Sequence, residues 1–229
     1  MRRDEFLKAA ALAPVAITLL PAGAKGQWFG GPAYAKVAEL SGKIWIGEKE
    51  AALGDKAAEG EKVRTGEDSS AVLKLSDESV MMLRPETTVV VPSEDNGGAL
   101  GLIAGAILSV FSSGDRAVKT PTSVAGVRGT GLYASVESEQ RTYLCTCFGK
   151  VDHFALNTPS INKTVEATHH AGLYIEGGGL KPAIKQAGMK EHTDEELRKL
   201  FAHYETPYSR WGRGRKLGPM PEFGWPPKK

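Results

Sequence analysis

The two cysteines of the chain stand two residues apart, at Cys145 and Cys147. The run around them is typical of a strand, so both sulfur atoms are expected on one face, with the Cα atoms about 6.6 Å apart. That separation is at the outer limit of disulfide geometry, so a local bridge would be strained. Free thiols, a bridge and a bound metal all stay open on this evidence.

Two adjacent histidines, His169 and His170, follow about twenty residues downstream. Thiolate sulfur and imidazole nitrogen are ligands that zinc accepts, so a metal ion or a haem held by these cysteines and histidines is one hypothesis. Adjacent residues of a strand face opposite sides, so only one of the two histidines could join. The alternative is that the cysteines pack as small buried apolar side chains and the protein has no cofactor.

Recognisable catalytic motifs do not occur in the chain. The sequence has no G-x-S-x-G, H-E-x-x-H, Walker A or dinucleotide-binding fingerprint. We therefore expect a protein that is not an enzyme and has no catalytic residues.

The body of the chain, residues 35–176, is predicted to be an all-β domain. Short runs with period-two patterning, such as 71–75 and 131–136, alternate with glycine, proline and other turn residues. Residues 100–111 are more continuously apolar, as in a strand buried on both faces. Runs 142–148 and 151–155 read as two strands joined by a turn at Gly149-Lys150. Many short strands indicate a sandwich, a roll or a solenoid-like fold.

The C-terminal part divides into a helical segment and an irregular tail. Residues 177–205 contain a helix over about 193–204, because Thr193 and Glu196 form a capping box ahead of an apolar stripe. Residues 206–229 are rich in proline and glycine, which precludes regular structure. Basic residues interleaved with tryptophan make this tail a candidate contact for an envelope component, through Trp211, Arg213, Arg215 and Lys216.

Residues 1–24 have the parts of a signal peptide. Arg2-Arg3 precedes a short apolar run and the small-residue pattern Ala22-Gly23-Ala24. The apolar run is too short for a bilayer span, and the double arginine resembles the twin-arginine export signal. We therefore expect a periplasmic or other extracytoplasmic protein with no integral membrane span in the mature chain.

Composition supports one soluble domain with an uneven charge distribution. The 229 residues are 41% hydrophobic and 24% charged, which excludes a multi-span membrane protein, a collagen and a wholly disordered chain. The net charge is +2, but residues 25–205 carry 20 basic and 24 acidic residues, whereas residues 206–229 carry six and one. An acidic body therefore precedes a basic tail. Because we expect export, nucleic acid is not an expected partner.

Two motifs in the body resemble the FecR-type domains. Those domains show a series "G-D, I-x-T-G, S-x-A-x-L-x-F-x-D-G-S", to which Gly54-Asp55 and residues 61–79 are similar. Residues 120–130 resemble the later hallmark "T-P-x-x-x-x-x-V-R-G-T". Glu78 departs from the pattern, because it stands where the family commonly has glycine in a tight turn. The signature positions are Gly66, Asp77, Val127, Arg128, Gly129 and Thr130.

The resemblance implies a periplasmic β-domain, best known in regulators that pass a siderophore-transport signal to a sigma factor. We expect a free-standing exported form that binds a protein or glycan partner in the cell envelope. Regulation of envelope signalling is the alternative, and a metal, haem or redox role for Cys145 and Cys147 is a second one. Arg128 could contact the partner, since its guanidinium suits carboxylates and phosphates. It could instead pair with an internal carboxylate while Gly129 permits the backbone geometry.

Overall fold

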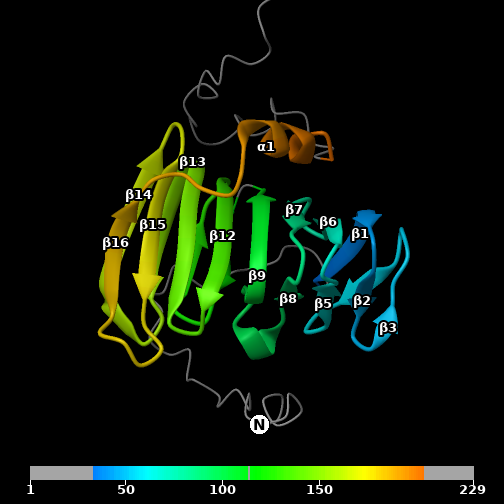
Figure 1. Cartoon of the computed structure of the whole chain (residues 1–229), viewed down its shortest axis with the longest axis horizontal. Helices are drawn as coiled ribbons and strands as arrows, with labels where there is room; N and C mark the ends of the chain where they lie inside the picture. The colour runs from blue at the N-terminus through cyan, green and yellow to red at the C-terminus, as the bar shows by residue number, and fades with distance from the viewer. Residues whose placement is uncertain (1–32, 113, 204–229) are drawn as a thin grey trace, which may run out of the picture.

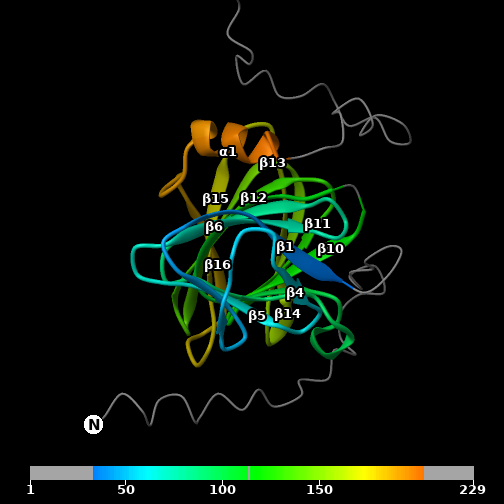
Figure 2. The ribbon, with the colours of Figure 1, turned by 90° about the vertical axis from the view of Figure 1, so that its right-hand side faces the viewer.

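The computed structural model describes residues 33–112 and 114–203, and these residues form an all-β fold with one α-helix near the C-terminal end. Two sheets pack face to face, and the helix lies over the outside of one of them. In Figure 2 the helix is at the top, with β5 and β14 of the second sheet at the bottom. The all-β prediction is confirmed, and the arrangement is a sandwich.

The first sheet is antiparallel throughout, and Figure 1 shows most of its strands side by side. Its strands run in the order β16 (Ala183–Ala187), β15 (Ala171–Glu176), β13 (Arg141–Ala155), β12 (Gly131–Ser138), β9 (Leu100–Val110), β7 (Val80–Leu83), β6 (Ser70–Leu75), β1 (Tyr34–Ser41) and β4 (Lys56–Ala58).

The second sheet shares β13 and β9 with the first. Its order is β14 (Thr158–Ala167), β13, β11 (Ser123–Val127), β10 (Arg116–Lys119), β9, β8 (Thr88–Val90), β5 (Lys62–Thr65), β2 (Ile44–Ile46) and β3 (Lys49–Glu50). Among the named strands of the described residues, only the pairing of β9 with β10 is parallel. A short 3₁₀ helix, η3 (Glu94–Asn96), precedes β9.

Two long strands cross from one sheet to the other at glycines with positive φ. β13 pairs with β12 and β15 up to Phe148, and with β11 and β14 from Gly149 onward. Gly149 has φ +84°, which lets the strand bend without ending. Gly105 has φ +74° and plays the same part in β9. The turn predicted at Gly149-Lys150 is therefore wrong, because both halves of the run keep strand partners through a bend.

The main core lies between the two sheets. Alternate residues of each strand point inward, as the period-two pattern predicts. The first sheet contributes Leu73, Leu83, Leu132 and Leu144, and the second contributes Leu102, Val118, Ala125 and Val151, all almost fully buried.

A second apolar cluster lies on the outer face of the first sheet, beneath helix α1 (Asp194–Phe201). Leu197 and Leu200 of the helix are buried there, and Phe201 stacks on Phe148 of β13 with ring centroids 5.7 Å apart. Full burial of each leucine contributes about 1.5–3 kcal/mol. A helix is present where one was predicted over about 193–204; it begins after the N-cap Thr193 and ends at Phe201.

Candidate metal centre

Cys145 and Cys147 lie on β13 and point outward from the first sheet, into the cluster beneath the helix. Leu144, the residue directly before Cys145, points inward to the main core. Both cysteines are free thiols with fully buried side chains. The strand alternation therefore places the two sulfur atoms on one face, as the sequence predicts.

His170 joins the cysteines from the connection between β14 and β15. Its backbone N–H donates to the carbonyl of Cys147 over 3.1 Å. Its φ is +35°, a region that residues other than glycine rarely adopt. This backbone geometry directs the imidazole toward the sulfurs, and its Nδ1 lies 3.7 Å from Cys145 Sγ.

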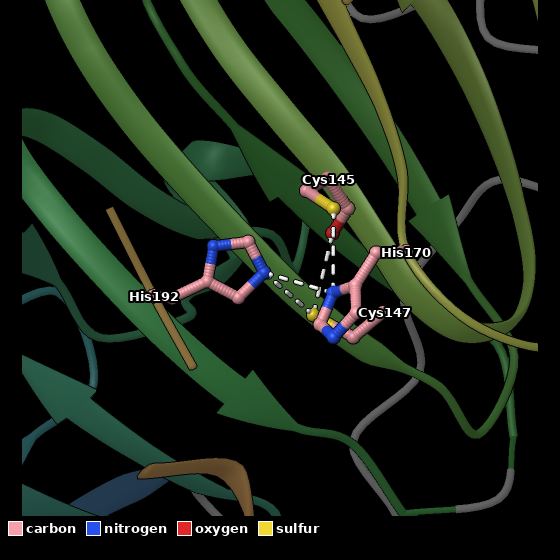
Figure 3. A group of neighbouring side chains, drawn as sticks. All are labelled: Cys145, Cys147, His170 and His192. Atoms are coloured by element: carbon pink, nitrogen blue, oxygen red, sulfur yellow. Dashed lines mark hydrogen bonds between the residues drawn. The ribbon is translucent and has the colours of Figure 1, made fainter. Parts of the chain in front are cut away.

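His192 completes the cluster from the segment between β16 and α1. Its ring stacks on Tyr133 of β12, with centroids 4.5 Å apart and an interplanar angle of 11°. The preceding residue, Glu191, has φ +62° and accepts a hydrogen bond from the Tyr133 hydroxyl. His192 Nε2 lies 3.5 Å from Cys147 Sγ. Figure 3 shows the two sulfur atoms and the two rings converging on one point.

The far side of each imidazole contacts an oxygen acceptor. His170 Nε2 lies 2.7 Å from Oδ1 of Asp194, the first residue of α1. His192 Nδ1 lies 2.7 Å from the backbone carbonyl of Lys190. Histidines that bind metals are held in this way, with the other ring N–H given to a carboxylate or a carbonyl.

The electrostatics of the cluster favour one thiolate. Hydrogen bonding from Cys147 lowers the pKa of Cys145 well below its usual range, helped by the two imidazoles and opposed by burial. The contact with Cys145 and burial raise the pKa of Cys147. Burial acts to lower the pKa of His170, but Cys145 and Asp194 outweigh it and raise that pKa. Thiolate is the form of cysteine that binds metals.

The four ligand atoms of Cys145, Cys147, His170 and His192 all lie within 4.8 Å of one another. That spacing suits a single ion. The Cys145 side chain is fully buried.

The predicted ligand set differs from this cluster at one position. His169 turns away and contacts Asp194 Oδ2 over 3.2 Å, so it belongs to a second, more exposed group with His170 and Asp194. His192 was missed, because nothing in the local sequence links it to cysteines 45 residues earlier. Its position directly before the capping residue Thr193 is the one signal that could have drawn attention to it.

The other predicted binding residues lie elsewhere. Arg128 is 46% exposed at the end of β11 and pairs with Asp115 and Asp152, each over 3.4 Å. Trp211, Arg213, Arg215 and Lys216 of the tail fall outside the described residues, as does the predicted signal segment.

The signature residues have structural places in the sandwich. Gly66 follows β5 and donates its N–H to the carbonyl of Lys43. Val127 is buried in the main core and Thr130 is fully buried, while Gly129 between them has φ +70°. Asp77, in the turn between β6 and β7, forms a buried ion pair with Arg116, a residue that sequence reasoning did not single out.

Comparison with known proteins bears on the body of the chain. Residues 61–152 match the FecR family model, described as "FecR protein". This stretch is therefore similar to a FecR-type domain and includes residues 61–79 and 120–130 of the two motifs, but not Gly54-Asp55. No match was found among curated proteins.

Two solved structures are similar to part of this chain. Both are crystal structures of a "putative anti-sigma factor" from Parabacteroides distasonis ATCC 8503, at 1.65 and 2.50 Å resolution. Each is 13% identical, covers 56% of this chain and has a TM-score of 0.46 or 0.45. The alignment spans 60% of those chains.

Among residues 33–112 and 114–203, no helix is both long and apolar enough to cross a bilayer.

Proposed function

We propose that this protein is an exported regulator of envelope signalling that acts by binding a protein partner, without catalysis. The match of residues 61–152 to the FecR family carries the proposal. The signal-peptide features of residues 1–24 support a periplasmic site of action, reached by the twin-arginine route. A glycan partner is the competing outcome that experiment must separate.

The chemistry of the buried cluster supports a role without catalysis. Both of its thiols and the imidazole of His192 are buried. A catalytic site needs a concave pocket that admits the substrate. Binding at the surface of the sandwich is therefore the more consistent mode of action.

Arg128 is the candidate contact residue within the FecR-type match. Its ion pairs with Asp115 and Asp152 are long and lie at the surface. Exposed pairs of this kind contribute about 0–1 kcal/mol, so a partner carboxylate or phosphate can replace them at little cost. The guanidinium is thus available for bidentate recognition.

Complementation of a deletion strain tests the proposal. Loss of the gene is expected to change the transcription of a limited set of envelope genes, and the intact chain is expected to restore it. Arg128→Ala should restore it poorly. Arg64→Ala is the matched control, because Arg64 is also about half exposed and pairs with the surface residue Glu48 over 3.7 Å.

Two results would contradict the proposal. One is an unchanged transcriptome in the deletion strain, together with no photo-crosslink from the Arg128 position to a protein. The other is saturable binding of purified chain to isolated cell-wall glycan that Arg128→Ala abolishes, which would favour the glycan partner.

A further inference from the structure

The two imidazoles of the buried cluster face each other in an arrangement that needs a cation. In the neutral rings, His170 Nε2 carries its hydrogen toward Asp194 and His192 Nδ1 carries its hydrogen toward a carbonyl, because both partners only accept. The unprotonated nitrogens, His170 Nδ1 and His192 Nε2, then lie 3.1 Å apart. Two lone pairs at that distance repel unless a proton or a metal ion lies between them.

Three of the six ligand–ligand distances match the edges of a zinc tetrahedron, and the other three are at most 4.8 Å. Zn–N bonds of about 2.05 Å and Zn–S bonds of about 2.3 Å give nitrogen–nitrogen edges of about 3.3 Å and sulfur–nitrogen edges of about 3.6 Å. The nitrogen–nitrogen distance is 3.1 Å, and the sulfur–nitrogen distances are 3.5 Å at Cys147 and 3.7 Å at Cys145.

We propose that Cys145, Cys147, His170 and His192 bind one Zn²⁺ in a closed site that fastens the C-terminal segment to the first sheet. Two sulfur and two nitrogen ligands in tetrahedral geometry favour zinc. Four protein ligands and full burial are typical of structural zinc sites. The thiol protons leave to solvent as the ion binds, so the two thiolates balance its charge. This inference does not depend on the proposed signalling function.

The site joins the middle of the first sheet to the segment that leads into α1. The two cysteines belong to the middle of the first sheet, whereas His192 directly precedes the helix cap Thr193. Beyond this site, α1 is held by its two buried leucines, by the stacking of Phe201 on Phe148 and by the pair between Arg84 and Glu196 over 2.6 Å. Zinc therefore fixes the start of α1, and its removal should loosen residues 188–203 more than the sandwich.

Metal content and spectroscopy of the full chain provide the test. Protein purified with a non-thiol reductant should contain a single Zn²⁺ per chain by elemental analysis. Co²⁺ in its place should give the intense visible bands of a tetrahedral site and a sulfur-to-metal charge-transfer band. Zinc should raise the melting temperature by at least about 5 °C and slow hydrogen exchange in residues 188–203.

Four variants separate this ligand set from the neighbouring group that shares His170. Cys147→Ser and His192→Gln should each weaken zinc binding by more than about 100-fold. Changing a residue that only hydrogen-bonds a ligand typically costs about 10–100-fold. His169→Gln removes only the second group and should leave the zinc content unchanged. His203→Gln, at the far end of α1, is the control for loss of a histidine.

Three outcomes would overturn the proposal. The first is a wild-type chain that has two free thiols and binds neither Zn²⁺ nor Co²⁺ above background. The second is metal lost in His169→Gln but kept in Cys147→Ser, which would assign it to His169, His170 and Asp194. The third is a Co²⁺ spectrum of the wild type without a sulfur charge-transfer band. The Co²⁺ spectrum is recorded on the wild-type protein, so it tests for cysteine ligands even if a variant fails to fold.

Discussion

Asp77 and Arg116 form an ion pair in the interior of the protein, with Nε and Oδ2 2.5 Å apart and both side chains 2% exposed. Asp77 also accepts hydrogen bonds from Ser79 and Ser112. Asp77 belongs to the turn between β6 and β7 of the first sheet, and Arg116 begins β10 of the second. The pair therefore links the two sheets through a residue of the FecR-type signature.

Breaking this pair on one side should destabilise the protein strongly. Arg116→Met leaves the Asp77 carboxylate buried without its countercharge, which costs about 3–5 kcal/mol. The double variant Asp77→Leu with Arg116→Met removes both charges and should recover a large part of that loss. Urea unfolding of the three proteins measures this difference. Equal loss in the single and double variants would show that packing, not charge, is the main effect.

Glu78→Gly should stabilise the protein. Glu78 has φ +70°, a conformation that costs a residue with a Cβ about 1–2 kcal/mol. Glycine removes that cost but adds unfolded-state entropy that costs about 0.5–1 kcal/mol, so a net gain between about 0 and 1.5 kcal/mol is expected. Glu139→Gly, at an exposed turn position without a positive φ, should destabilise instead. A lower melting temperature for Glu78→Gly would refute the strain argument.

His153 should make the fold sensitive to mild acid. Burial lowers the pKa of this fully buried imidazole to about 4 from 6.5. As the pH falls, the His153 imidazole therefore gains a proton near pH 6.5 in the unfolded chain, but only near pH 4 in the folded chain. Stability is complete above pH 6.5 and falls between these values, by about 3 kcal/mol in total.

His153→Gln removes this titration and keeps a polar group beside Thr146, whose hydroxyl lies 3.3 Å from His153 Nε2. Unfolding free energies measured from pH 7 to pH 4.5 should therefore fall less steeply in the variant. The comparison uses the slope, so a constant loss of stability in the variant does not matter. Parallel pH profiles would mean that other groups produce the acid sensitivity.

Arg128→Ala should change stability little, by less than about 1 kcal/mol, because the Arg128 side chain is half exposed and both of its ion pairs are 3.4 Å long. Chemical denaturation beside Arg64→Ala checks this expectation. A loss of several kcal/mol in Arg128→Ala alone would assign Arg128 a structural role, and its use as a partner contact would then lose support.

Asp194→Asn should lower zinc affinity by about 10–100-fold, if zinc binds as proposed, because the carboxylate orients the His170 ring. Glu195→Gln is the matched control, since Glu195 is exposed in the same helical turn and contacts only Lys199 among the described ion pairs. Competition against a chelating dye measures both affinities. Equal affinity in the two variants would mean that Asp194 does not support the ligand.

Local patterns in the sequence predicted the parts of the fold that depend on neighbouring residues. The capping box of Thr193 and Glu196 marks the start of α1 because both groups lie within one turn. Period-two alternation places Cys145 and Cys147 on one face for the same reason. Gly149 was misread because a glycine after a strand indicates a turn and a bend equally well, and only the partners on each side distinguish them.

Long-range partners were beyond the reach of such patterns. His192 meets Cys147 across 45 positions, and Arg116 meets Asp77 across 39. Each contact depends on the order in which strands stack, for which one sequence provides no signal. The resemblance to FecR-type domains marked Asp77 as a signature residue but left its partner unnamed.

The spread of the four ligands along the chain sets an order of assembly. Cys145 and Cys147 leave the ribosome well before His170, and His192 comes last, after β16. A nascent chain that does not yet include His192 can offer only part of the ligand set. If zinc binds as proposed, capture of the ion by all four ligands therefore follows synthesis of the segment between β16 and α1.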